Sequence, residues 1–125
     1  MATIKSFSDL EQSKKLAEIL PLESADMVYV HTIDLEGDEH YDIDFSNNQP
    51  LFEDDISAWS LAALLELLPK RLEIIDNVYE LNVYLYGLYY WNTINGNLCF
   101  ESKDADNLVD ACVAMVENLH ELKML

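Results

Sequence analysis

The sequence is poor in the residues that several kinds of site require. It has three glycines, two cysteines and seven Lys and Arg residues among 125. Three glycines leave no glycine-rich loop to cradle a phosphate, and the G-x-S-x-G nucleophile elbow is absent from the sequence. Cys99 and Cys112 do not make a disulfide framework, and their apolar neighbours predict two buried thiols.

Apolar segments of the lengths used for targeting and membrane spanning are also missing from the sequence. The first residues have no apolar core like that of a signal peptide. The longest dense apolar run, residues 61–68, is too short to span a bilayer. Together with the two unpaired cysteines, these features lead us to expect a cytoplasmic protein.

Acidic residues are abundant. There are 24 Asp and Glu residues, and the formal net charge is −17 at pH 7. Such a chain repels nucleic acid phosphates and anionic lipids, so we expect it to bind neither directly. Three explanations of the charge remain: a surface that keeps the protein soluble, binding of a basic protein partner, or binding of a metal. Half of the residues are hydrophobic and no linker interrupts them, which predicts a single domain over residues 1–125.

Three stretches have apolar residues at helical spacing. They cover residues 6–21, 60–69 and 102–125. Glu11 in the first stretch suggests a capping box, and the leucine stripe of the second predicts a helix that is central to the core. The predicted N-caps are Ser8 for the first helix, Ser60 with Ser57 as the alternative for the second, and Asp104 or Ser102 for the third.

Alternating residues predict two antiparallel elements. Residues 26–33 and 40–45, separated by a turn at Gly37, predict a hairpin with one packed and one wet face. Asn95-Gly96 predicts a second hairpin within a three-stranded meander, in which Gly87 marks a turn or a bulge. The order α-β-β-α-β-β-β-α predicts an α+β fold, with helices packed on one face of a mostly antiparallel sheet.

Two stretches, "WSLAALLELLP" at 59–69 and "NLVDACVAMVENL" at 107–119, carry a resemblance. With "YELNVYLYG" and "LCFES" between them, they resemble small uncharacterised proteins encoded in phage genomes and mobile elements of gut bacteria. The resemblance covers roughly residues 57–122. It implies a bacterial cytoplasm and an accessory role, and it implies no catalytic residue.

Candidate metal ligands lie in the run "DLEGDEHYDID". An EF-hand that starts at Asp34 fails, because its sixth and twelfth residues are Glu39 and Phe45. Two alternatives stay open: a calcium site from Asp34, Asp38 and Asp42, or a transition-metal site from His40, Asp42 and Asp44. A solvated hairpin explains the same residues, so we assign no catalytic, metal or cofactor-binding residue.

Aromatic residues crowd between positions 79 and 91. If the chain turns at Gly87, Tyr84, Tyr86 and Tyr90 share a sheet face opposite Leu81 and Val83. Exposed tyrosines are typical of interfaces, although cross-strand pairing also explains them. We therefore predict a protein interface there, and a homodimer in preference to a monomer.

Three functions fit these observations. The first is a non-enzymatic protein-binding module, whose acidic surface could imitate nucleic acid toward a basic host protein. The second is a structural homo-oligomer without a ligand. The third is a metal-dependent enzyme that uses the strand of His40.

Overall fold

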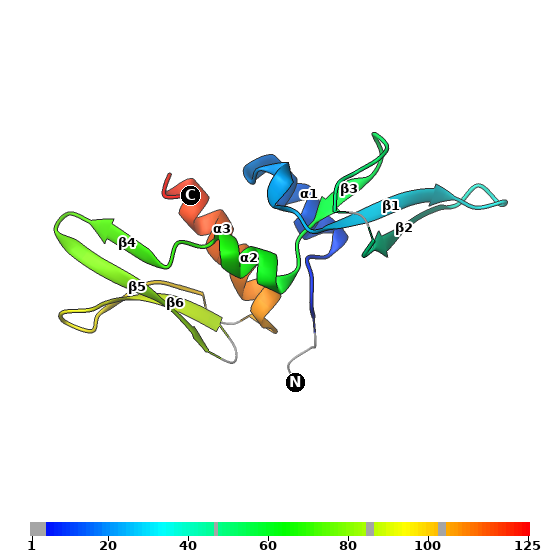
Figure 1. The fold of residues 1–125 in the computed structure, drawn as a ribbon. Helices are drawn as coiled ribbons and strands as arrows, with labels where there is room; N and C mark the ends of the chain where they lie inside the picture. Colours follow the sequence, from blue (N-terminus) through cyan, green and yellow to red (C-terminus); the bar gives the residue numbers. More distant parts are fainter. Residues whose placement is uncertain (1–4, 47, 85–86, 103–104) are drawn as a thin grey trace. The chain divides into compact units, whose positions relative to one another are not determined.

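The computed structural model describes residues 5–46, 48–84, 87–102 and 105–125 (Figure 1). The chain divides into two compact units, which we call the N-unit (residues 6–63) and the C-unit (residues 1–5 and 64–125). That the chain behaves as a single domain stays a prediction.

The N-unit contains one α-helix, a 3-10 turn and an antiparallel sheet with the strand order β2-β1-β3. Its elements are α1 (Leu10–Ile19), η1 (Leu22–Ser24), β1 (Met27–Ile33), β2 (Glu39–Asp44) and β3 (Ile56–Ala58).

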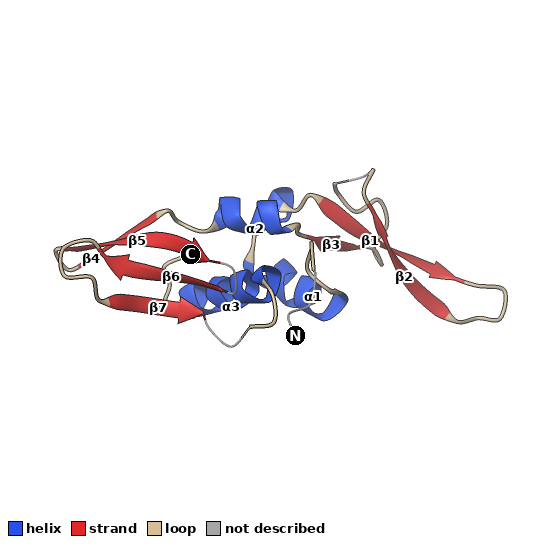
Figure 2. Ribbon diagram, turned by 90° about the horizontal axis from the view of Figure 1, so that it is seen from below, coloured by secondary structure: helices blue, strands red, loops and turns tan. Residues whose placement is uncertain are grey.

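The C-unit contains a four-stranded antiparallel sheet with the order β4-β5-β6-β7 and a long helix (Figure 2). Helix α2 (Leu61–Leu67) crosses the boundary between the units at Ala63 and Leu64. The other elements are β4 (Arg71–Ile74), β5 (Asn77–Tyr84), β6 (Gly87–Asn92), β7 (Leu98–Ser102) and α3 (Leu108–Glu121).

The predicted α+β class and the predicted order of elements are confirmed. The strands form two sheets, and helices pack against them. Two short strands, β3 and β4, are added to the predicted ones. The predicted hairpin at Asn95-Gly96 is present between β6 and β7, where Gly96 has a φ of 75°. The turn before Gly87 lies outside the described residues, and Gly87 itself is the first residue of β6.

Helix α1 begins one residue later than the sequence predicts. Asp9, and not Ser8, is the N-cap, and the capping box is completed by Gln12 instead of Glu11. Ser8 is unavailable as a cap because it is buried and bonded elsewhere. Its Oγ contacts Ser13 Oγ at 2.7 Å and accepts a hydrogen bond from the backbone N–H of Trp59.

Trp59, which directly follows β3, is fully buried. Its backbone carbonyl accepts from the N–H of Ser8 at 2.8 Å, and its indole Nε1 donates to Ser24 Oγ at 3.0 Å. Leu16 of α1 and Val28 of β1 are buried with it. The segment before α1 is therefore fixed against the end of β3 by hydrogen bonds that cross some fifty residues of sequence.

The core of the C-unit lies between α3 and one face of its sheet. Leu88 and Tyr90 of β6 are fully buried, as are Val109, Val116 and Leu119 of α3, and α3 contacts β6 and β7. The helix begins at Leu108 with Asn107 as its N-cap, so it starts later than predicted. Ser102 belongs to β7, which excludes it as the cap, and Asp104 lies outside the described residues.

Helix α2 confirms the clearest sequence prediction. Ser60 caps it, since its Oγ accepts from the N–H of Ala63 at 3.1 Å, and Asp26 accepts hydrogen bonds from both the backbone N–H and the hydroxyl of Ser60. Leu64 and Leu68 are buried, which makes one face of this helix part of the core.

Replacing Leu64 with Ala should lower the free energy of unfolding by about 2–5 kcal/mol, because a fully buried leucine is truncated. Urea unfolding followed by circular dichroism measures the change. Leu35→Ala is the control, since that side chain is fully exposed and its loss should change little. Equal midpoints for the two variants would show that Leu64 is not a core residue.

The turn between β4 and β5 is strained. Ile75 and Asp76 form a two-residue loop with φ values of 44° and 63°, flanked by the pair Ile74 and Asn77. Such a loop favours Asn and Gly, whereas a β-branched residue rarely adopts a positive φ. Ile75 is 88% exposed, so little burial compensates for the strain.

Ile75→Asn should therefore raise the free energy of unfolding by about 1 kcal/mol. Ile94→Asn serves as the matched control, because Ile94 is 84% exposed in a hairpin loop and has no positive φ. Chemical denaturation of both variants decides the matter. An Ile75→Asn variant no more stable than its control contradicts the strain.

Candidate functional site

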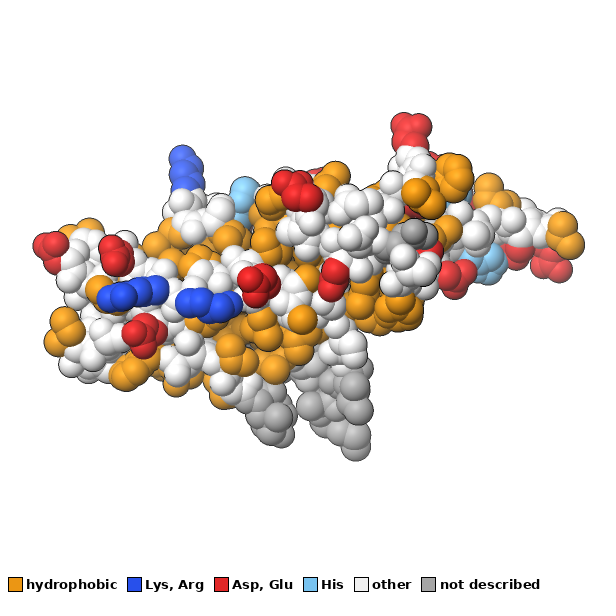
Figure 3. Space-filling model, viewed as in Figure 1, with side chains coloured by type: hydrophobic (Ala, Val, Ile, Leu, Met, Phe, Trp, Pro, Cys, Tyr) orange, Lys and Arg blue, Asp and Glu red, His pale blue; other side chains and the backbone are white. Residues whose placement is uncertain are grey.

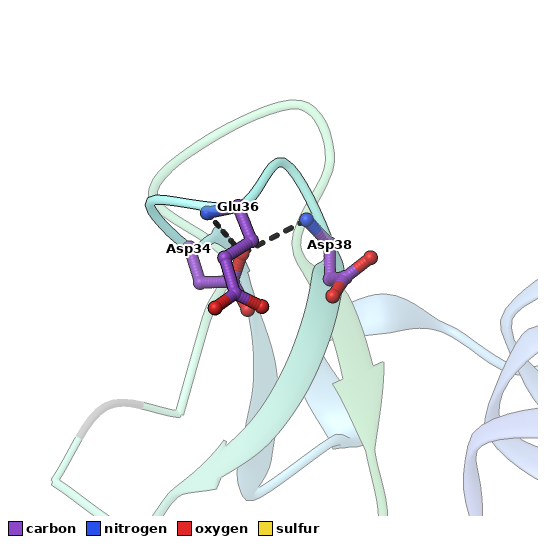
Figure 4. Close-up of side chains that lie close together, drawn as sticks. All are labelled: Asp34, Glu36 and Asp38. Carbon is purple, nitrogen blue, oxygen red and sulfur yellow. Dashed lines mark hydrogen bonds between the residues drawn. The ribbon is translucent and has the colours of Figure 1, made fainter.

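The tip of the β1–β2 hairpin is organised by one carboxylate. Oδ1 of Asp34 accepts hydrogen bonds from the backbone N–H groups of Glu36 and Asp38, both at 2.9 Å (Figure 4). Oδ2 of Asp34 lies 2.8 Å from Nε2 of His40. The pKa of Asp34 is held below its usual value of 3.8, mainly by the contact with His40 and then by the hydrogen bonds from the backbone amides.

Asp34, Glu36 and Asp38 form the one acidic cluster with metal-ligand spacing among the residues that the structure describes. Their carboxylate oxygens come within 4.8 Å of one another, and all three residues are exposed. The sequence predicts Asp34 and Asp38 in such a group with Asp42; the structure brings in Glu36 instead. Both oxygens of Asp34 already have hydrogen-bond partners, and three oxygen ligands are fewer than calcium takes.

His40, Asp42 and Asp44 lie on one face of β2, as predicted. They pair with Thr32, Val30 and Val28 on β1. Two of them have different partners, however: His40 contacts Asp34, whereas Asp44 accepts from Ser46. The structure thus confirms their common face, and a metal-dependent enzyme built on this strand stays a hypothesis.

A second acidic group surrounds His31 on the opposite face of β1. Its Nε2 is 3.5 Å from Oε1 of Glu39, and its Nδ1 is 3.8 Å from Oδ2 of Asp54. Asp55 accepts from the backbone N–H of His31 at 3.2 Å, and its other oxygen accepts from the N–H groups of Leu51 and Phe52. The acidic loop 51–55 is therefore attached to the hairpin.

The N-unit carries most of the negative charge. It holds fourteen of the 24 acidic residues and two of the seven Lys and Arg residues, which leaves −12 of the total −17. Residues 16–69 include thirteen acids and no Lys or Arg. Every residue from 34 to 40 is exposed. The visible face of the hairpin in Figure 3 accordingly shows Asp, Glu and His side chains without a Lys or Arg.

The predicted row of Tyr84, Tyr86 and Tyr90 needs correction. Tyr84 is 39% exposed, but Tyr90 is fully buried and its hydroxyl donates to the carbonyl of Pro69 at 2.7 Å. Tyr86 lies outside the described residues. Tyr90 pairs with Leu81 and shares the packed face, because cross-strand partners point to the same side of a sheet.

Tyr84 instead shares its face with two aromatic residues that the sequence analysis did not select, Tyr89 and Trp91. The pairs Asn82–Tyr89 and Glu80–Trp91 place them there, and the rings of Tyr84 and Tyr89 are 5.8 Å apart. Two residues separate β5 from β6, so even positions on β5 share a face with odd positions on β6. A turn of two residues between these strands would therefore have placed Tyr89 and Trp91 on the face of Tyr84.

Neither cysteine is activated as a nucleophile. Cys112 is buried on α3, and burial raises the pKa of its thiol to about 12. Burial also raises the pKa of Cys99. A thiolate, which is the reactive form, is therefore disfavoured at both positions near neutral pH.

A cleft of about 440 Å³ lies in the N-unit beside α1. Its lining is mostly apolar and includes Leu22 and Ile56, with Lys14, Glu18 and Asp55 as its charged residues. Asp55 already accepts three backbone hydrogen bonds, and the Nζ of Lys14 lies 5.9 Å from the ring centre of Tyr41. The cleft has a size typical of ligand sites, but one of its two carboxylates, Asp55, holds the loop 51–55 in place.

Comparisons with known proteins give no relative from which a function could be carried over. No protein-family model matches the sequence, and no curated protein or solved structure shows a significant similarity to it. Among the described residues, no helix combines the length and the apolar character needed to cross a bilayer.

The His40 contact predicts a shift that can be measured at Asp34. His40→Ala should raise the pKa of Asp34 toward 3.8, as followed by NMR titration of the carboxyl carbon. Because this pKa is lowered in the folded chain, the ionised carboxylate stabilises the hairpin above pH 3.8, and that contribution is lost as the pH falls through the folded pKa. His120→Ala, in the C-unit, should leave Asp34 unchanged. An unaltered titration in His40→Ala would mean that the backbone amides alone set the pKa.

Proposed function

We propose that this protein is a non-enzymatic binding protein, which takes a basic segment of another protein against the acidic hairpin of its N-unit. The observation that carries the proposal is the stretch of residues 16–69, which has thirteen acids and no Lys or Arg. A partner with clustered Lys and Arg would supply the cations that this surface lacks.

The geometry of the hairpin supports such a role. Asp34 fixes the tip through backbone hydrogen bonds, so neighbouring carboxylates project from a defined turn instead of a loose loop. Asp55 likewise accepts a hydrogen bond from the backbone N–H of His31, which attaches the acidic loop 51–55 to β1. Fixed charges of one sign attract an oppositely charged partner over a distance and orient it on approach.

The biological setting is part of the proposal. The resemblance of residues 57–122 supports an accessory protein of a phage or mobile element in a bacterial cytoplasm. A basic host protein that normally holds nucleic acid is then a suitable partner, because the carboxylates of Asp42 and Asp44 lie on one face of β2, two residues and about 6.6 Å apart along the strand. In that case the acidic surface occupies the place of phosphates.

Two variants of equal net charge test whether the hairpin is the binding surface. One carries Glu36→Gln, Asp38→Asn, Glu39→Gln and Asp42→Asn; the other carries Glu66→Gln, Asp76→Asn, Glu101→Gln and Glu121→Gln in the C-unit. All eight residues are exposed, and each variant has a formal charge of −13. Binding of a fluorescent deca-arginine peptide is measured by anisotropy at low and high salt.

The hairpin variant should bind the peptide about tenfold more weakly than the C-unit variant, since four exposed ion pairs of modest strength are lost. Affinity of the wild type should fall as salt rises, because screening weakens exposed charges. Equal losses in the two variants would show that only net charge matters. Binding that persists at high salt would exclude an electrostatic contact.

A further inference from the structure

One face of the C-unit sheet carries aromatic side chains away from its helix-packed side. We call it the aromatic face: Tyr84, Tyr89, Trp91 and Leu98, with Arg71, Glu73 and Glu80 on the same side by cross-strand pairing. Tyr84 and Leu98 are exposed, and Tyr89 and Trp91 are half-buried. The opposite face holds Leu88 and Tyr90, which are fully buried.

Tryptophan on this face retains an unused hydrogen-bond donor. Within the part of the chain that the structure describes, the indole N–H of Trp91 donates to no acceptor. Tyrosine and tryptophan with one apolar body and one free polar group are the side chains most enriched at protein interfaces.

The edges of this sheet are poorly suited to pairing with another strand. Strand β4 has four residues and presents Arg71 and Glu73, both exposed. Strand β7 pairs irregularly with β6, with a register shift between Leu88 and Tyr90, and its Phe100 has a φ of 51°. Short, charged or bulged edges resist strand addition, so a partner would approach the face.

Charge favours a second copy of this chain as that partner. The C-unit carries −5 of the total charge, so two copies repel one another less here than through the N-unit. The face itself has both signs, since Arg71 pairs across the strands with Glu80. In a two-fold symmetric contact the same surface patch of both copies takes part, and every contact between two residues occurs twice. Arg71 of one copy can then contact Glu73 or Glu80 of the other.

We propose that the aromatic face is the contact of a weak homodimer. Four strands about 4.8 Å apart and some six residues long present roughly 400 Å² per copy, about half of what a standard stable interface buries. Association is therefore concentration-dependent. It involves a different unit from the acidic hairpin, so either proposal can fail without the other.

Sedimentation velocity over a range of protein concentrations, at 50 and 500 mM NaCl, tests the proposal. The dimer should tighten as salt rises, because repulsion between two chains of −17 is screened. This trend is the reverse of that expected for a basic partner. Tyr89→Ser/Trp91→Ser should weaken dimerisation by about 30-fold or more, as expected when interface anchors are removed. Leu35→Ser/Phe52→Ser removes one aliphatic and one aromatic side chain from the N-unit and should leave it unchanged.

A second pair of variants does not depend on removing a half-buried aromatic residue. Arg71→Glu and Lys15→Glu change the net charge equally, and both residues are exposed. Arg71→Glu should weaken the dimer much more than Lys15→Glu, because only Arg71 is on the aromatic face. A wild type that stays monomeric under all conditions overturns the proposal. A dimer that responds equally to both charge reversals, or not at all to the aromatic change, places the contact elsewhere.

Discussion

Carboxylates outnumber cationic side chains by 24 to seven in this chain, so most of them need a stabilising partner other than Lys or Arg. Backbone amides supply it at many positions. Asp9 accepts from the start of α1, Asp34 from the tip of the first hairpin, and Asp55 from three residues of two segments. Each of these carboxylates thereby fixes a helix start, a turn or a loop, and the acidic composition becomes a source of local structure.

The acidic residues are unevenly distributed between the two units. The N-unit holds −12 and the tip of its hairpin is exposed, whereas the C-unit holds −5 and carries the aromatic face. Charge acts over distance and weakens with salt, while apolar contact acts at short range and is not screened. The acidic hairpin is thus suited to a charged partner and the aromatic face to an apolar contact. The two kinds of binding can be distinguished because they depend on salt in opposite directions.

Local patterns of the sequence predicted the parts of this fold that depend on neighbouring residues. Ser60 and the leucines after it define α2, and alternation defines the faces of β2. Features that depend on contacts between residues far apart in the sequence were not predicted. Strand β3 has only three residues and pairs with β1 from across the loop, and Ser8 loses its capping role to contacts with Trp59. At the candidate interface, Tyr90 was misplaced because the face of a residue depends on the number of residues in the preceding turn.

Helix α2 has seven residues, about two turns, and three of them belong to one unit and four to the other. A helix this short does not persist by itself in water, because its few hydrogen bonds barely offset the cost of nucleation. Asp26 and Ser60, both in the N-unit, stabilise its first turn by hydrogen bonds, and burial of Leu64 and Leu68 stabilises its C-terminal end. Melting of either unit would therefore release one end of α2 and unravel the whole helix.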